Sequence, residues 1–75
     1  MNTTLLEEID LLLLYSQQSS QQGIKVHSNA SPDKQVAAAR LFEKGLISQA
    51  DGGYLTDRGM EAADHCQHLV ALLKA

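Results

Sequence analysis

Three helix-start signals divide this 75-residue chain into three helical stretches joined by short connections. An N-cap side chain accepts a hydrogen bond from a backbone N–H in the first turn, so such residues mark where helices begin. The three signals are Thr4, Ser31 and Thr56. Thr4 opens a Ser/Thr-x-x-Glu capping box with Glu7, and Ser31 precedes Pro32, which suits the first position of a helix. With the apolar periodicity that follows each of them, they predict helices over about residues 4–17, 32–44 and 57–73.

Glycine-rich turn chemistry between the second and third helices predicts a β hairpin. Asp51-Gly52-Gly53 separates the short β-like runs at residues 46–48 and 54–55, and an Asp-Gly or Gly-Gly pair between apolar runs is typical of a tight turn. The hairpin is expected near residues 46–56. Alternation of apolar and polar residues at 24–27 indicates a possible short strand. The predicted fold class is therefore mainly α with a small antiparallel β hairpin.

The length of the chain and its single cysteine limit it to one small domain, residues 1–75. A chain of this size buries only about 60% of the surface that it exposes when unfolded, and one cysteine forms no internal disulfide. A core this thin depends on good local propensity, on a partner or on self-association. Every residue from Ser16 to Gln22 is Ser or Gln, which predicts a flexible segment at 16–22.

The first helix carries more apolar residues than one buried face holds. At about 100° per residue, its predicted core arc contains Leu5, Leu6, Ile9, Leu12 and Leu13. The apolar residues outside the predicted stripes are Leu11, Leu14 and Tyr15 in this helix and Leu72 in the last one. Because exposed apolar patches mark interfaces, these four residues form the predicted self-association surface. The alternative is that Tyr15 and one leucine are scattered surface residues.

The second and third helices have one predicted inward face each. Ala38, Leu41 and Phe42 define the inward stripe of the second helix, and truncating a buried Phe42 to alanine is expected to cost about 3–5 kcal/mol. Gly45 is expected to close this helix in a left-handed conformation. The predicted buried face of the last helix contains Ala62, Ala63, Cys66, Leu69, Val70 and Leu73.

Two gapped motifs at matching separation carry a resemblance to a known family. Residues 39–47 read Ala-Arg-Leu-Phe-Glu-Lys-Gly-Leu-Ile and residues 52–59 read Gly-Gly-Tyr-Leu-Thr-Asp-Arg-Gly. This pattern resembles winged-helix bacterial regulators, in which a recognition helix ends in Leu-x-x-Lys-Gly-Leu-Ile, a hairpin wing follows, and Tyr-x-Leu-Thr-x-x-Gly opens the closing helix. The whole chain also resembles a small uncharacterised bacterial family of about this length, loosely labelled DNA-binding. The resemblance implies a winged-helix-like fold lacking the second helix, because the interval at residues 28–31 is too short to hold one.

The distribution of charge gives DNA binding limited support. The net charge is −3, and residues 23–48 form the only basic segment. If the resemblance extends to DNA binding, the candidate contacts are Lys25, Lys34, Gln35, Arg40 and Lys44. A protein that contacts six or more phosphates needs about as many basic groups on one surface. This chain has six Lys and Arg in total, and none of them lies at the hairpin tip.

No pattern in the sequence indicates catalysis. Phosphate-binding glycine loops and nucleophile motifs are absent from it, and so small a chain has little volume for a pocket. His65 and His68 share a helix face with Glu61, but Cys66 points away into the apolar stripe, so we interpret them as polar surface rather than a metal site. The protein is predicted to be no enzyme and to take no cofactor, metal or small-molecule substrate.

The apolar run at residues 11–15 is far shorter than the roughly 20 residues that span a bilayer. No membrane partner is therefore expected, and the expected location is cytoplasmic.

Two functions remain after these exclusions. The first function is a non-catalytic winged-helix-like interaction module, regulatory in role, that forms a homodimer or docks on a protein partner. The alternative is a small dimeric DNA-binding transcriptional regulator.

Overall fold

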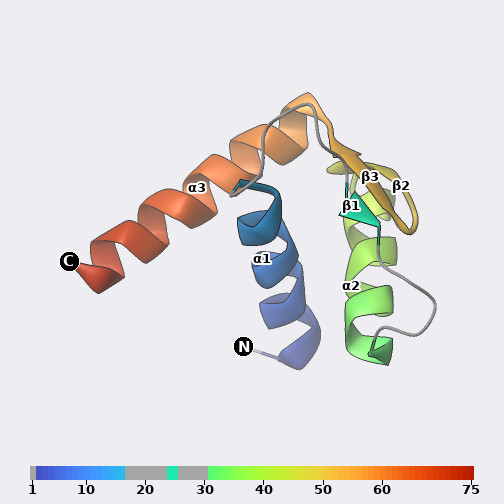
Figure 1. Ribbon diagram of the computed structural model, residues 1–75, viewed down its shortest axis with the longest axis horizontal. Coiled ribbons are helices and arrows are strands. Elements are labelled where there is room, and N and C mark those ends of the chain that lie inside the picture. The colour runs from blue at the N-terminus through green and yellow to red at the C-terminus, as the bar shows by residue number, and fades with distance from the viewer. Residues whose placement is uncertain (1, 17–23, 26–30) are drawn as a thin grey trace.

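The computed structural model describes residues 2–16, 24–25 and 31–75, and it is mainly helical. The helices are α1 (Thr3–Ser16), α2 (Pro32–Glu43) and α3 (Asp57–Lys74), and the strands are β1 (Ile24–Lys25), β2 (Ile47–Gln49) and β3 (Gly52–Leu55). The predicted fold class is confirmed, since the described residues form three helices and a small antiparallel β element, which lies beside α2 and the start of α3 (Figure 1). Of the predicted flexible segment at 16–22, Ser16 belongs instead to the last turn of α1, and residues 17–22 lie outside the described residues, as do the predicted strand residues 26–27.

Two of the three predicted helix starts are confirmed. Ser31 Oγ accepts from the Lys34 N–H at 3.4 Å, and Thr56 Oγ1 accepts from the Gly59 N–H at 3.1 Å. The predicted capping box at Thr4 is wrong. The N–H of Leu5 donates to Asn2 Oδ1 at 2.8 Å instead. As a result, α1 begins at Thr3, one residue before the predicted start, and the Glu7 side chain pairs with Lys34 of α2.

The three strands form one antiparallel sheet in the order β1-β3-β2. The central strand places Gly53 opposite Ile24 on one side and Leu55 opposite Ile47 on the other. Gly53 has a φ of 78°, and a Cβ on it would lie 2.2 Å from Ser48 Oγ. Both the backbone conformation and the close approach of the Ser48 hydroxyl therefore require glycine at this position of the hairpin.

The core forms where α1 packs against both α2 and α3 (Figure 1). The buried apolar residues are Leu11, Leu12 and Tyr15 from α1, Ala37, Ala38 and Leu41 from α2, Ile47 from β2 and Ala63 from α3. Small side chains supply much of the α2 and α3 contribution, which lets the helices approach closely. The core is correspondingly thin, and α1 contributes its largest side chains.

The face that α1 buries differs from the predicted one by about 100° around the helix. Leu5 and Leu6 of the predicted core arc are 40% and 49% exposed, whereas Leu11 and Tyr15 are 3% and 6% exposed. Apolar residues surround most of α1, so their spacing alone does not select the inward face. The prediction that Leu11 and Tyr15 belong to a self-association surface is therefore wrong, because both side chains are already covered within the chain.

The end of α2 closes as predicted, but Phe42 does not lie in the core. Gly45 adopts a φ of 77°, and the N–H of Leu46 donates to the Leu41 carbonyl at 3.0 Å, as in a Schellman closure. Leu41 is 1% exposed, whereas its neighbour Phe42 is 44% exposed. The inward stripe of α2 is centred on Ala37, Ala38 and Leu41, which turns the Phe42 ring partly to the surface.

The two sequence motifs that carry the winged-helix resemblance contact each other where the end of α2 meets the start of α3. Thr56 Oγ1 donates to the Gly45 carbonyl at 2.6 Å, and the Thr56 N–H donates to the Leu46 carbonyl at 3.0 Å. The same Leu46 carbonyl lies against Gly59. Residues from both motifs therefore connect the end of α2 to the start of α3, and these contacts give them a structural role.

Candidate functional site: an exposed apolar surface on α1 and α3

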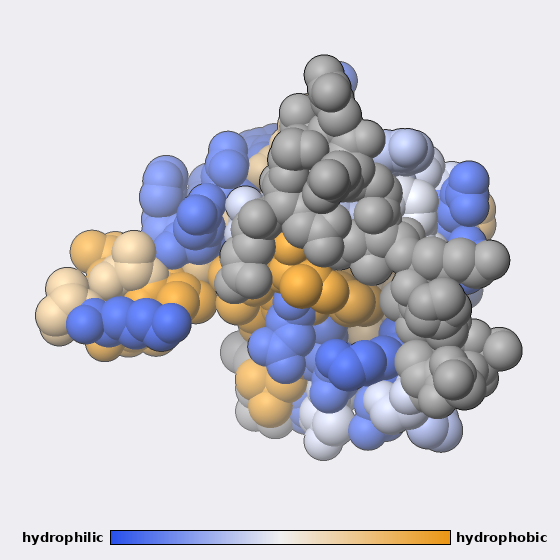
Figure 2. Space-filling model, in the orientation of Figure 1, coloured by the Kyte–Doolittle hydropathy of each residue, from blue (hydrophilic) through white to orange (hydrophobic). Residues whose placement is uncertain are grey.

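The C-terminal part of α3 projects from the body of the molecule with its leucines exposed. Leu69 is 55% exposed, and Leu72 and Leu73 are each 75% exposed. Figure 2 shows apolar side chains along this end of α3, which stands clear of the other elements. We call residues 67–74 the α3 arm. At 1.5 Å per residue, the arm is about 12 Å long.

The exposed leucines continue the face that packs on the core earlier in the same helix. Ala62, Cys66, Leu69 and Leu73 follow one another at spacings of four, three and four residues, which places them on one side of a helix. Ala62 and Cys66 pack against the core cluster. The stripe is continuous along α3, but the prediction that Leu69 and Leu73 are buried is wrong, because the body of the molecule ends before the stripe does.

A second, partly exposed apolar strip lies on α1. Glu7 and Glu8 both pair with side chains of α2, which fixes the side of α1 that faces α2. The opposite side contains Leu6, Ile9 and Leu13 on a helical wheel. Ile9 and Leu13 are half-buried and Leu6 is exposed. We call these three residues the α1 ridge, and we call the arm and the ridge together the apolar surface.

The predicted self-association residues divide between the surface and the core. Leu72 lies on the α3 arm, and Leu14 is exposed on α1 outside the ridge. Leu11 and Tyr15 are core residues. The sequence did not reveal Leu6, Leu69 and Leu73 as surface residues, because each belongs to a regular apolar stripe that looks like a core face.

Tyr15 connects α1 to the hairpin through its hydroxyl group. The Tyr15 hydroxyl donates to the Gly53 carbonyl at 3.1 Å. Burial, and secondarily the negative charge of Asp51, raises the pKa of Tyr15 to about 12. The phenol therefore stays neutral at any physiological pH, and its role is to hold the first helix against the sheet.

Three of the predicted DNA-contact residues pair with the acidic side chains of α1. Lys34 Nζ lies 3.4 Å from Glu7 Oε2, Arg40 Nε lies 3.3 Å from Glu8 Oε2, and Lys44 Nζ donates to Glu8 Oε1. Gln35 is exposed on α2 and is engaged in an interaction of its own. Lys25 belongs to β1, and its side chain lies outside the described part of the structure.

Glu8 is the central residue of this network. Its carboxylate is 3% exposed, while Arg40 and Lys44 are half exposed, so a buried anion is held by two cations that still contact water. A buried carboxylate without such partners would carry a large desolvation cost. The sequence offered a signal for this pairing, because Arg40 and Lys44 are four residues apart and share one face of α2.

No metal-binding cluster is present among residues 2–16, 24–25 and 31–75. These residues include no group of three or more His, Cys, Asp or Glu side chains placed to hold a metal ion. His65 Nε2 lies 3.8 Å from Glu61 Oε1 on the exposed face of α3. Burial raises the pKa of the Cys66 thiol, which disfavours the reactive thiolate. Within the described ranges, no helix is both long enough and apolar enough to cross a membrane.

The structure defines a small helical protein with a three-stranded sheet and an exposed apolar surface. The chain belongs to a family of unknown function, DUF5669, whose match extends over residues 1–74. Neither the curated proteins nor the solved structures contain a match to it.

Proposed function

We propose that this protein is a non-catalytic, winged-helix-like interaction module with a regulatory role in the cytoplasm, and that it docks on a protein through its apolar surface. The observation that carries the proposal is the continuation of the apolar face of α3 beyond the core. The order of helix, strand, helix, hairpin and helix supports the winged-helix-like description. The single cysteine is in keeping with a reducing compartment.

The amount of apolar area on the arm supports docking. The exposed parts of Leu69, Leu72 and Leu73 amount to about two whole leucine side chains. Fully burying one leucine contributes about 1.5–3 kcal/mol, so covering the arm contributes on the order of 3–6 kcal/mol. The total stability of a small domain is only about 5–15 kcal/mol. The free energy available from covering the arm is therefore large on the scale of the whole protein.

The contacts of α2 do not favour the DNA-binding alternative. Phosphate binding requires basic groups that are available to the backbone of the nucleic acid. Lys34, Arg40 and Lys44 are each directed to a carboxylate of α1. A duplex would have to compete with Glu7 and Glu8 for these cations, and the acidic side chains would then face the phosphates.

Photo-crosslinking in the native cell tests the proposed docking. A photoreactive residue replaces Leu72 on the arm, and a matched control places the same residue at Gln49, which is exposed on β2. Position 72 is expected to give a discrete protein adduct that mass spectrometry identifies, and position 49 is expected to give none. The adduct should disappear when Leu69→Asp and Leu73→Asp are added.

Two results would contradict the proposal. One is the absence of any protein adduct at position 72 under conditions in which the labelled chain is folded. The other is an adduct that persists in the Leu69→Asp, Leu73→Asp background, because it would not depend on the apolar face of the arm. Nuclease treatment before analysis separates protein adducts from nucleic acid adducts.

A further inference from the structure

We propose that the partner of the apolar surface is a second copy of this chain, with the α3 arm of each copy lying on the α1 ridge of the other. This inference rests on the proposed function and names its partner. The resulting dimer has two-fold symmetry, and each copy supplies both an arm and a ridge to the interface.

The shape of one copy supplies the first argument. The arm diverges from α1, and within one chain Leu69, Leu72 and Leu73 of the arm and Leu6 of the ridge stay exposed (Figures 1 and 2). A two-fold interface brings the same patch of both copies together, so the patch must be complementary to itself. A projecting apolar helix beside an apolar ridge meets this condition, because the arm of each copy packs on the ridge of the other copy. Both arms and both ridges are then covered in one interface.

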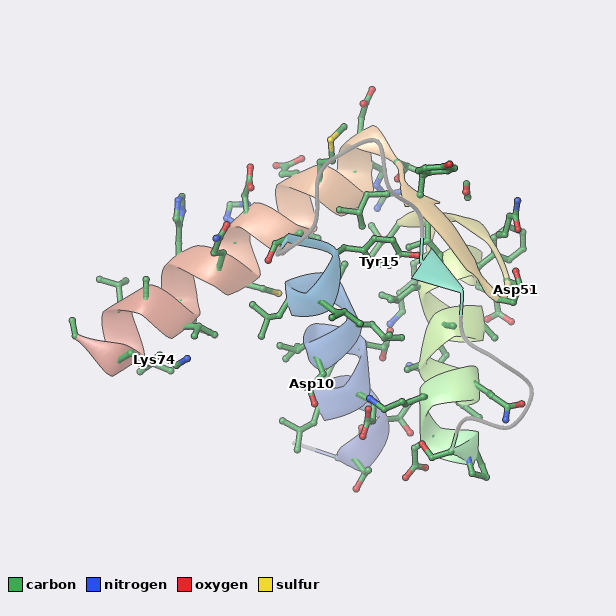
Figure 3. The ribbon with its side chains drawn as sticks, viewed as in Figure 1. Asp10, Tyr15, Asp51 and Lys74 are labelled. Carbon is green, nitrogen blue, oxygen red and sulfur yellow. The ribbon has the colours of Figure 1, made fainter. Side chains whose placement is uncertain are left out.

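Two charged residues supply the second argument. Asp10 borders the α1 ridge, four residues after Leu6 and three before Leu13, and Lys74 ends the arm. Figure 3 shows Asp10 on α1 and Lys74 at the C-terminal end of α3, across the open angle between the two helices. Neither side chain forms an ion pair with another described residue. Laying each arm on the partner's ridge brings a positive end toward a negative border twice in the dimer.

The size of the surface sets the expected strength of the dimer. An arm about 12 Å long offers only a few side chains, and two arm-on-ridge contacts place the interface at or below the lower end of the usual range of about 1,200–2,000 Å². We therefore expect a reversible dimer with a dissociation constant of roughly 10 to 100 micromolar, since association entropy offsets much of the gain from burial.

Sedimentation equilibrium of the purified full chain over roughly 5–500 micromolar tests the dimer. The weight-average mass of the parent is expected to rise from 8.2 kDa toward twice that value. Leu73→Asp should keep the chain monomeric, because a carboxylate would replace an apolar contact in both arms. The matched control is Val36→Asp, which changes an exposed apolar residue on α2 away from this surface and should dimerise like the parent.

Charge reversal tests which groups meet across the interface. Asp10→Lys and Lys74→Asp are each expected to weaken the dimer by roughly tenfold, because each creates a like-charge contact twice. The double reversal should recover most of the loss. Far-UV circular dichroism confirms that each variant is folded, which is expected because both residues are exposed.

The results distinguish this inference from the proposed function. A parent that stays at 8.2 kDa at every concentration rejects the second copy, even if cellular crosslinking at position 72 captures a different protein and so supports the docking module. A dimer that survives Leu73→Asp, or that Val36→Asp abolishes, overturns the arm-on-ridge arrangement. If the double charge reversal fails to recover dimerisation, the contact between Lys74 and Asp10 is rejected.

Discussion

Gly59 lies directly against the backbone carbonyl of Leu46, so close that a Cβ on residue 59 would stand 1.9 Å from that oxygen. The same carbonyl accepts from the Thr56 N–H, which prevents it from moving freely. The first turn of α3 is therefore packed on the end of α2 through backbone atoms, and only glycine fits at this contact.

Gly59→Ala is expected to destabilise the protein by about 1–3 kcal/mol, because the new methyl group must displace backbone. This figure is the net loss, after the gain of up to about 1 kcal/mol that alanine brings to a helix relative to glycine. Thermal unfolding measures the effect, and Gln67→Ala on the exposed face of α3 is the control for helix propensity. A Gly59→Ala variant that melts at or above the parent temperature would contradict the close contact.

Leu41 and Phe42 are neighbours with opposite expected sensitivities. Leu41→Ala should cost about 2–5 kcal/mol, because the side chain is fully buried and its removal leaves a cavity. Phe42→Ala should cost only about 1–2 kcal/mol, because nearly half of the ring already contacts water. Urea unfolding of the two variants compares them directly. A larger loss for Phe42→Ala than for Leu41→Ala would place the ring in the core after all.

Glu8→Gln removes the buried charge while keeping the shape of the side chain. We expect a loss of about 1–3 kcal/mol, because hydrogen bonds from Arg40 and Lys44 to a charged acceptor are replaced by weaker ones to an amide. Glu7→Gln is the matched control, with a single partner on an exposed lysine, and should cost no more than about 1 kcal/mol. Equal losses in chemical unfolding would show that burial of Glu8 is unimportant.

Tyr15→Phe deletes only the hydroxyl group that bonds to Gly53. The loss of this hydrogen bond should lower the free energy of unfolding by about 0.5–1.5 kcal/mol at neutral pH. The folded pKa is raised from 10.0 to about 12, so the stabilising effect of the neutral phenol is complete below pH 10. It is lost as the pH rises from 10 to 12.

An ultraviolet titration measures the Tyr15 ionisation separately. Tyr54→Phe leaves Tyr15 as the one tyrosine, so the absorbance of the phenolate reports this residue alone. We expect its midpoint near 12 in the folded chain. A midpoint close to 10, the ordinary value for an exposed tyrosine, would mean that the hydroxyl is not enclosed between α1 and the hairpin.

Local signals predicted the elements of this fold well. Ser31, Thr56 and Gly45 act through atoms within a few residues of themselves, so their chemistry is readable from the sequence. The inward face of α1 depends instead on contacts with residues more than 30 positions away, such as that of Glu8 with Arg40. Leucines on nearly every side of α1 leave the spacing ambiguous, and the long-range ion pairs resolve it.

The candidate site was predictable in part. Leu72 is the one residue of the predicted self-association set that lies on the apolar surface, because its position off the stripe was visible in the sequence. Leu69 and Leu73 were assigned to the core, since they continue the face of Ala62 and Cys66. The point at which a helix extends past its packing partners depends on the lengths and angles of the other elements. The spacing of apolar residues carries no information about these lengths and angles.

The buried carboxylate of Glu8 also determines how α1 aligns along α2. A shift of α1 by one helical turn in either direction would bring Thr4 or Leu12 opposite Arg40 and Lys44 and would leave the carboxylate buried without a cation. The same shift would bring Glu7 and Glu8, or Tyr15 and Ser16, to the core positions that Leu11 and Leu12 occupy. The buried acidic side chain and the buried leucines of α1 therefore select the same alignment, and the ion pairs add a penalty for misaligned packing that apolar contacts alone do not provide.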